Sequence, residues 1–251
     1  MSRTERNIRL LAAYDGTDFS GWQRQDGVKG RTVQGVLEAA LAKLHKRPVN
    51  LSAAGRTDAG VHAVGQVANF YTDIKNMAAE RFVPALNSLL PQDLRVLTAQ
   101  ETSPEFHARF DAQSRTYRYY IIAERHAFPH ELRYALQLWR HPHIERLNSY
   151  ARCLRGELDC SVFASPQDPS HSRNRYFFSA LFFVERDTLV FEITANAFLW
   201  KMVRSIVGTL LYCEEHDVSP DAFKTLLASG ERKLAGPTAP PRGLFLWNVA
   251  Y

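Results

Sequence analysis

Apolar and polar positions in the first half of the chain alternate between short strand-like runs and longer helix-like stripes. Residues 8–14 form an apolar run that ends at Asp15-Gly16, which is typical of a strand entering a turn. From Val33 to Lys46, apolar residues recur at helical spacing, with Thr32 placed to cap the helix. Further strands are predicted at 49–53, 65–71 and 94–98, and a second helix at 78–90.

The second half shows the same mixture of patterns. Residues 114–122 alternate so that Tyr117 and Tyr119 share one face of a predicted strand, with Arg118 on the other face. Helices are predicted at 144–155, 198–213 and 221–229, and strands at 180–185, 189–195 and 246–251. Because the periodic pattern breaks at residues 102–104, we predict an N-terminal domain over 1–102 and a C-terminal domain over 103–251, both of the α+β class.

Composition narrows the class of protein further. The 251 residues are 45% hydrophobic, and 31 Lys and Arg against 26 Asp and Glu give a net charge of +5. A basic balance favours a polyanionic partner, although many basic proteins bind no nucleic acid. The three cysteines form no C-x-x-C pair, the first residues lack the apolar core of a signal peptide, and no apolar run reaches membrane length. We therefore expect a cytoplasmic protein with reduced thiols and no membrane contact.

The segment from Ala53 to His62 is the strongest candidate for chemistry. It places Asp58 near Arg56 between two predicted strands, and a nearby cation favours the ionised carboxylate that a nucleophile or base requires. Gly55 and Gly60 would permit a tight backbone path. A structural turn with a surface ion pair explains the same residues, and composition alone weighs the two interpretations about equally.

Other segments carry weaker signals. Trp22, Gln23 and Arg24 suit contact with nucleic acid, yet Trp22 could equally fill the core. Tyr117 on its basic, aromatic strand is a plausible base-stacking residue, and tyrosines at the edge of a core are at least as common. Four histidines between His126 and His143 lack any supporting carboxylate or cysteine spacing, so no metal site is predicted. The polar, basic loop 165–175 could lie on a phosphate backbone or simply be solvated.

The predicted helix at 198–213 is apolar except for a strip of Lys201, Arg204, Ser205 and Gly208. Arg204 on such a helix requires an anion, because a buried arginine without a partner is unfavourable. Any acidic neighbour could serve, and Asp58 is the functional candidate. Gly208 would let another backbone segment approach the helix.

Taken together and in this order, the sequence motifs resemble the bacterial tRNA pseudouridine synthase A family over about residues 8–251. The motifs are Tyr14-Asp15-Gly16-Thr17, Gly21-Trp22-Gln23-Arg24-Gln25, Thr32-Val33-Gln34, Ala54-Gly55-Arg56-Thr57-Asp58-Ala59-Gly60-Val61-His62, Phe106-His107-Ala108-Arg109-Phe110, Tyr117-Arg118-Tyr119 and Met202-Val203-Arg204-Ser205-Ile206-Val207-Gly208. The segment around Asp58 is highly specific to the family, whereas the tyrosine strand and the arginine helix are weak signals alone.

The resemblance implies a pseudouridine synthase fold, in which the mainly antiparallel sheets of two halves join into a platform with a basic cleft between them. It implies isomerisation of uridine at tRNA positions 38, 39 and 40, in the anticodon stem and loop, by a homodimer without cofactor or metal. Asp58 falls on the family's catalytic aspartate, Tyr117 on its uracil-stacking tyrosine and Arg204 on the arginine that pairs with the aspartate. Arg56 matches a loop arginine that helps displace the target nucleotide. The expected RNA contacts are Tyr117, Arg56, Trp22, Gln23, Arg24, His62 and Arg109.

Two other classes of function remain open at this level. A non-catalytic RNA-binding module or RNA chaperone would use the same basic and aromatic surface. An aspartate-based hydrolase or metal-dependent nuclease would want a second acidic group close to Asp58, and the sequence from Gly55 to Tyr71 contains no other carboxylate. The isomerase is therefore the favoured hypothesis.

Overall fold

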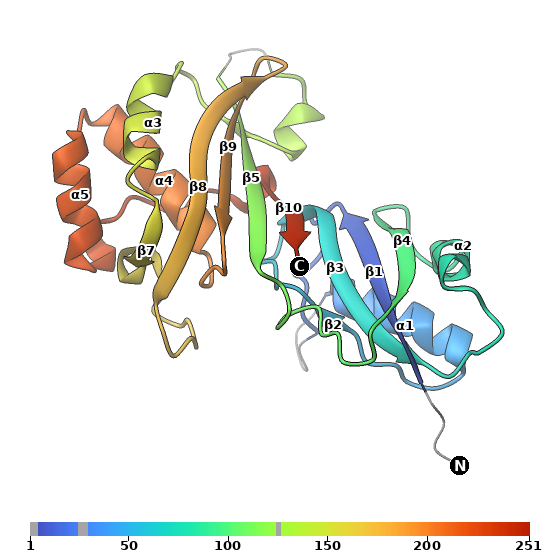
Figure 1. The fold of residues 1–251 in the computed structure, drawn as a ribbon. Helices are drawn as coiled ribbons and strands as arrows, with labels where there is room; N and C mark the ends of the chain where they lie inside the picture. The colour runs from blue at the N-terminus through green and yellow to red at the C-terminus, as the bar shows by residue number, and fades with distance from the viewer. Residues whose placement is uncertain (1–4, 25–29, 124–126) are drawn as a thin grey trace. The chain divides into compact units, whose positions relative to one another are not determined.

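The computed structural model describes residues 5–24, 30–123 and 127–251 (Figure 1). The chain forms two compact units. Unit 1 comprises Met1–Gln113 together with Leu246–Tyr251, and unit 2 comprises Ser114–Phe245. No helix within the described residues is long and apolar enough to cross a membrane.

Unit 1 contains a sheet in the order β4-β1-β3-β10, with β2 paired to β3. Its strands are β1 (Arg6–Tyr14), β2 (Ser52–Ala53), β3 (His62–Thr72), β4 (Leu94–Thr102) and, from Leu246 on, β10 (Leu244–Ala250). β1 is antiparallel to both neighbours, with Leu10 opposite Ala68 of β3 and Ala99 of β4. The sequence predicted a strand here from its apolar run, and in the structure alternate residues from Ile8 to Tyr14 are buried, so one face of β1 lies on the core.

Helix α1 (Val33–His45) covers this sheet and begins as predicted, because Thr32 Oγ1 accepts a hydrogen bond from Gly35 N at 3.2 Å. Its last residue, His45, hydrogen-bonds Thr72 Oγ1 of β3 at 2.8 Å, which fixes the helix on the sheet. The predicted helix 78–90 is shorter than expected and consists of η1 (Ala79–Arg81) and α2 (Phe82–Asn87). α2 ends at Asn87, whose side chain bonds both backbone groups of Val96 in β4, at 2.8 and 2.9 Å.

Residues 103–113, which follow β4, pack on the sheet of unit 1. Asn7 Nδ2 donates to the carbonyl oxygens of Ser103 and Phe106 at 2.9 and 2.8 Å, and Asn69 Oδ1 accepts from Ala108 N at 2.9 Å. The compact units therefore divide after Gln113, and the last strand returns to unit 1. The division into domains after residue 102 stays a prediction, and it differs from these compact units because side-chain bonds from β1 and β3 hold the following segment.

Unit 2 contains the strand order β5-β9-β8-β7. The strands are β5 (Ser114–Ile122), β6 (Leu136–Gln137), β7 (Gly156–Asp159), β8 (Asn174–Glu185) and β9 (Thr188–Ala195), and all these pairs are antiparallel except β5 with β6. The hairpin β8–β9 turns at Arg186 and Asp187, both with positive φ, as expected for a two-residue turn. β8 begins six residues earlier than the predicted 180. A bulge between Phe177 and Ser179 breaks the alternation in this part of the strand, so the sequence pattern does not show it.

The helices of unit 2 are α3 (Ile144–Ala151), α4 (Met202–Glu215) and α5 (Pro220–Ser229), which lie on one side of β8 and β9 in Figure 1. Asn148 of α3 bonds both backbone groups of Phe182, at 2.9 and 2.8 Å, and so anchors α3 to β8. α4 begins at Met202 rather than at the predicted Phe198, because Lys201 adopts a left-handed φ of 61°. The remaining short helices are η2 (Glu131–Arg133), η3 (Ser161–Phe163), η4 (Arg232–Leu234) and η5 (Pro241–Gly243).

Both units thus combine helices with mainly antiparallel strands, which confirms the predicted α+β class. Each unit buries its own apolar residues. Large fully buried side chains include Phe70 and Phe82 in unit 1, and Tyr150 and Phe223 in unit 2.

Candidate active site

Asp58 lies in the loop between β2 and β3, as the sequence predicted. It opens a tight turn in which Val61 N donates to Asp58 O at 3.2 Å and Gly60 has a φ of 76°. Asp58 is half-buried, whereas the neighbouring Arg56 and Ala59 are exposed. The turn therefore presents the Asp58 carboxylate from a short segment that is closed by a backbone hydrogen bond between its first and last residues.

Thr57, the residue before Asp58, is held at two points. Its Oγ1 lies 2.8 Å from the buried hydroxyl of Tyr14, and its carbonyl accepts from Trp22 N at 3.0 Å. Burial raises the pKa of Tyr14 to about 12, outweighing the opposite effect of its hydrogen bonds with Thr57 and Gln66. Tyr14 therefore stays protonated at neutral pH and anchors the loop as an uncharged group.

The segment between β1 and α1 supports the Asp58 loop from beneath. Gly21 has a φ of 91°, and a Cβ at this position would lie 2.8 Å from the carbonyl oxygen of Thr57. A Cβ on Gly16 would lie 2.0 Å from the carbonyl oxygen of Val61. Only residues without a side chain allow these two backbone segments to approach so closely. Sequence reasoning found these glycines only as parts of motifs and did not assign them this supporting role.

Trp22 is 3% exposed, and its ring packs 6.1 Å from that of Tyr14. The structure thus gives Trp22 the core-filling position that the sequence left open as an alternative. Gln23 is half-buried, and Arg24 is exposed with its Nη1 3.1 Å from Glu38 Oε2. Glu38 in turn accepts from Gln34 Nε2 at 3.0 Å and from Leu51 N at 3.2 Å, so this acid connects α1 to the segment before β2.

His62 is fully buried at the start of β3. Its Nδ1 lies 3.0 Å from Gly16 N and 3.2 Å from Asp15 Oδ1. A neutral ring accepts from Gly16, and a protonated ring donates to Asp15; both arrangements tie β3 to the turn that follows β1. Arg109, by contrast, is exposed and lies 5.7 Å from the ring centre of Phe110.

In unit 2, Tyr117 lies on β5 opposite Ile193 and is 7% exposed. Its ring meets Phe198 edge-on, with centroids 5.1 Å apart and an interplanar angle of 86°. Arg118, on the opposite face of β5, donates to Glu192 Oε2 at 2.7 Å, which confirms the predicted alternation along this strand. The orientation of Tyr117 is therefore fixed by packing.

Arg204 lies half-buried on α4, where its Nε donates to the carbonyl oxygen of Ala239 at 2.8 Å. Ala239 N donates back to the carbonyl oxygen of Arg204 at 3.0 Å. A Cβ on Gly208 would lie 1.7 Å from the carbonyl oxygen of Pro237, so the prediction that Gly208 admits another backbone is confirmed. The segment 235–240 thus lies along α4 and fixes the Nε of the Arg204 guanidinium group.

Tyr119 is buried beside Tyr117 on β5, and its hydroxyl donates to the carbonyl oxygen of Pro240 at 2.9 Å. Burial raises the pKa of Tyr119, and the opposing effect of Arg204 and Arg242 is smaller. Unit 2 therefore brings Tyr119 and Arg204 to the same segment, whereas Asp58, Arg56, Trp22 and His62 gather in unit 1. The pairing of Asp58 with Arg204 stays a prediction.

Other reactive groups in the described parts of the chain offer no second centre. No cluster of three or more His, Cys, Asp and Glu suitable for a metal ion occurs there. His126 of the histidine segment lies outside the described residues. The cysteines are free thiols, and burial raises the pKa of Cys160 to about 12 and that of Cys213 to about 11. Those two thiols are therefore protonated at neutral pH and unsuited to nucleophilic chemistry.

Comparison with known proteins places this arrangement among the pseudouridine synthases. A family model described as tRNA pseudouridine synthase matches residues 10–111 and 150–251. The first segment includes Asp58 with its supporting loops, and the second includes α4 with Arg204; Tyr117 lies between them. The chain belongs to the tRNA pseudouridine synthase family, as its sequence motifs predicted.

Several relatives match over nearly their full lengths, and each is named tRNA pseudouridine synthase A. The protein of Treponema denticola is 55% identical over 254 residues, covering 100% of this chain and 95% of the relative. That of Treponema pallidum (strain Nichols) is 49% identical, covering 92% of this chain and 84% of the relative. That of Geobacillus kaustophilus is 43% identical, covering 98% and 95%.

Proposed function

We propose that this protein isomerises uridine to pseudouridine in the anticodon stem and loop of tRNA, with Asp58 as the nucleophile. Membership of the tRNA pseudouridine synthase family supports the reaction. The observation that carries the assignment to Asp58 is the turn at residues 58–61, which holds a half-buried carboxylate on a backbone clamped by Tyr14 and Trp22.

The reaction breaks the bond between uracil N1 and ribose C1′ and forms a bond between uracil C5 and the same ribose carbon. The proton on C5 leaves, N1 gains a proton, and no water adds. One ionised carboxylate can begin this by attacking C1′, by adding to uracil C6 or by removing the ribose 2′ proton. Each route needs Asp58 charged and held close to the sugar, and the turn at residues 58–61 supports the proposal because it fixes the backbone that carries the carboxylate.

Arg204 and Tyr117 complete the proposed catalytic set. A cation next to Asp58 favours the ionised carboxylate, and we assign this role to Arg204 because its Nε is already fixed by Ala239. Tyr117 would hold the face of the uracil while the base turns, and its edge-on contact with Phe198 keeps that ring in one orientation. Both roles rest on the family resemblance together with these contacts.

The target base must leave its stack to react, and Arg56 is the proposed residue that takes its place in the RNA. Arg56, Arg24 and Arg109 have exposed side chains, so we assign them to contacts with the RNA backbone. His62 and Trp22 are buried, so we assign them to support of the Asp58 loop. The protein would act as a homodimer in the cytoplasm, where free thiols such as its three cysteines are kept reduced.

Release of tritium from tRNA containing uridine labelled at C5 tests the proposal. Wild-type protein should release tritium, whereas Asp58→Asn should release none and still bind tRNA. Asp187→Asn is the matched control, because Asp187 is an exposed carboxylate in the β8–β9 turn with a φ that asparagine also adopts. Full activity of Asp58→Asn would refute the assignment. Binding of tRNA without tritium release by the wild type would favour the RNA-binding module or chaperone instead.

A further inference from the structure

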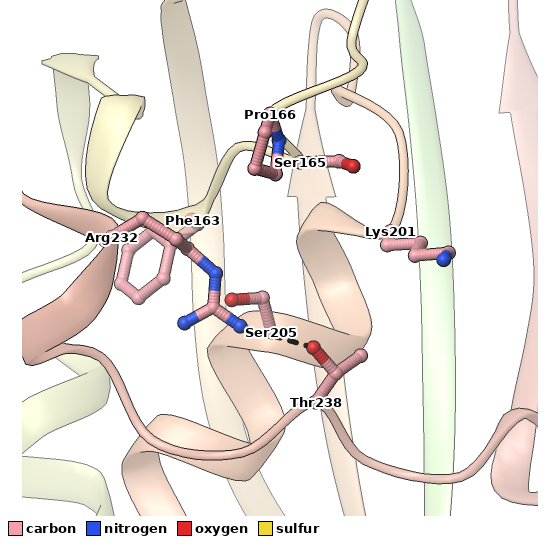
Figure 2. A pocket seen from close by; sticks show the side chains of 7 residues that line it. All are labelled: Phe163, Ser165, Pro166, Lys201, Ser205, Arg232 and Thr238. Atoms are coloured by element: carbon pink, nitrogen blue, oxygen red, sulfur yellow. Dashed lines mark hydrogen bonds between the residues drawn. The ribbon is translucent and has the colours of Figure 1, made fainter.

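A pocket of about 190 Å³ lies in unit 2 where α4 begins (Figure 2). Its polar lining consists of two cations, Lys201 and Arg232, and three hydroxyl groups, those of Ser165, Ser205 and Thr238. The pocket is far larger than the ~10–15 Å³ that a single water molecule needs. None of the lining residues carries a carboxylate, so the chemistry of the pocket favours an anion.

Ser205 supplies the decisive observation. Its side chain lines the pocket, it is 1% exposed, and its Oγ has no hydrogen-bond partner among the described residues. Figure 2 shows this hydroxyl on the side of the pocket where Arg232 lies. A buried hydroxyl without a partner is unfavourable, and most such groups in proteins are satisfied. The hydroxyl is therefore placed to donate to a ligand.

Arg232 is oriented by neutral acceptors. Its Nη1 donates to the carbonyl oxygen of Gly236 at 3.3 Å, and its Nη2 donates to Thr238 Oγ1 at 3.1 Å, the bond drawn in Figure 2. Since Thr238 Oγ1 accepts from Arg232, its own proton remains available to a ligand. No carboxylate pairs with Arg232 in the described part of the chain, so its charge is not neutralised there.

Lys201 adds a second charge at the start of α4. It occupies the N-cap position without a side-chain cap, and the partial positive charge of the helix N-terminus adds to its own. Its Nζ lies 4.5 Å from the ring centre of Trp200, which is 38% exposed. Asp168, which accepts hydrogen bonds from Ser170 N and Trp200 N, does not line the pocket.

We propose that this pocket binds a backbone phosphate of the RNA while a neighbouring base stacks on Trp200. A phosphate offers acceptor oxygens for Ser205, Thr238 and Arg232, and Lys201 adds a second cation to the lining. An exposed aromatic ring next to a phosphate site is what a polymer of alternating phosphates and bases can use and a free phosphate cannot. The inference rests on the proposed function, because it takes tRNA as the ligand.

Two substitutions and a control test the site through tRNA affinity, measured by fluorescence anisotropy at several salt concentrations. Ser205→Ala changes no charge and should weaken binding about 5- to 20-fold, without lowering the melting temperature, because the hydroxyl has no partner in the free protein. Lys201→Gln should weaken binding and reduce the slope of log K against log salt by about 0.7–0.9. Lys233→Gln is the control: Lys233 is exposed, pairs with Glu231 at 2.7 Å and does not line the pocket.

Wild-type affinity and salt slope in both Ser205→Ala and Lys201→Gln would overturn the proposal. So would stabilisation by inorganic phosphate that Ser205→Ala abolishes without any change in tRNA affinity, since the pocket would then serve a free anion. If Ser205→Ala fails to fold, the tRNA affinity and salt slope of Lys201→Gln are compared with those of Lys233→Gln, and equal values in the two variants would overturn the proposal. Tritium release by the wild type judges the proposed reaction independently, because the binding measurements require no turnover.

Discussion

The hydroxyl of Tyr14 lies 2.8 Å from Thr57 Oγ1, inside the core of unit 1 and one residue before the proposed nucleophile. Tyr14 is the last residue of β1, and Thr57 belongs to the loop between β2 and β3. The contact therefore joins the loop to the end of a strand whose other residues are held on both edges by β3 and β4. It makes the position of Asp58 dependent on the sheet itself.

Tyr14→Phe should lower the free energy of unfolding by about 1–3 kcal/mol, because Thr57 Oγ1 loses a buried partner. Tritium release should also fall, since the loop that carries Asp58 loses one of its two clamps. Urea denaturation and turnover measure the two effects. Tyr150→Phe is the control, because Tyr150 is buried in unit 2 and its hydroxyl bonds the carbonyl oxygens of Cys213 and Val218. If Tyr14→Phe and Tyr150→Phe lose the same turnover at the same loss of stability, the Asp58 loop is not specifically affected.

The pKa of Tyr14, raised from 10.0 to about 12 by burial, predicts how stability depends on alkaline pH. The folded state favours the protonated phenol, so this contribution to stability is complete below pH 10 and is lost as pH rises through about 12. Urea denaturation between pH 9 and pH 12 should show a steeper loss of stability in the wild type than in Tyr14→Phe. Parallel curves of unfolding free energy against pH for the two proteins would contradict this prediction.

Gly21→Ala should disturb the Asp58 loop directly. The new Cβ would lie 2.8 Å from the carbonyl oxygen of Thr57, in a backbone with φ of 91°. We expect destabilisation of about 2–4 kcal/mol and a loss of turnover larger than that in Tyr14→Phe. Gly156→Ala provides the matched control, because Gly156 has a φ of 74° and no other group lies within 4 Å of the place that the new methyl would occupy. That variant should lose only about 1–2 kcal/mol and keep its activity.

Arg204→Ala should reduce turnover on the order of 100-fold or more, because Asp58 would lose its proposed charge partner. Affinity for tRNA should change little. Arg118→Gln removes a cation of the same unit that already pairs with Glu192, and it should leave turnover near the wild-type value. Single-turnover kinetics with saturating protein separates the chemical step from binding. A normal rate in Arg204→Ala would exclude the pairing.

Local patterns predicted most of the helices and strands correctly, because α1, β1, β5 and β9 each bury one face of a regular repeat. The sequence also placed Asp58 at a strand-to-strand connection. What it did not show was decided by bonds between residues far apart in the chain and by local backbone conformation. Asn7 and Asn69 hold Phe106 and Ala108 on the sheet of unit 1, and the left-handed conformation of Lys201 delays the start of α4.

The candidate site was likewise predicted only in part from local patterns. Residue types and spacing identified Asp58, Arg204 and Tyr117 as candidates for chemistry. They could not separate residues that face the substrate from residues that support the loop, because burial depends on the fold. His62 and Trp22 illustrate this, since each belongs to a specific motif and each is buried under the Asp58 loop. The unpartnered hydroxyl of Ser205 is likewise visible only in three dimensions.

Leu246–Tyr251 belongs to unit 1 although it follows unit 2 in the chain, so the sheet of unit 1 is completed late in synthesis. β3, the strand that follows Asp58, is hydrogen-bonded to β10, and the ribosome delivers β10 only after all of unit 2. Until then one edge of β3 lacks its neighbour, and an unpaired edge can pair with other chains. The order of synthesis thus delays completion of the sheet that contains β3 until unit 2 has been made.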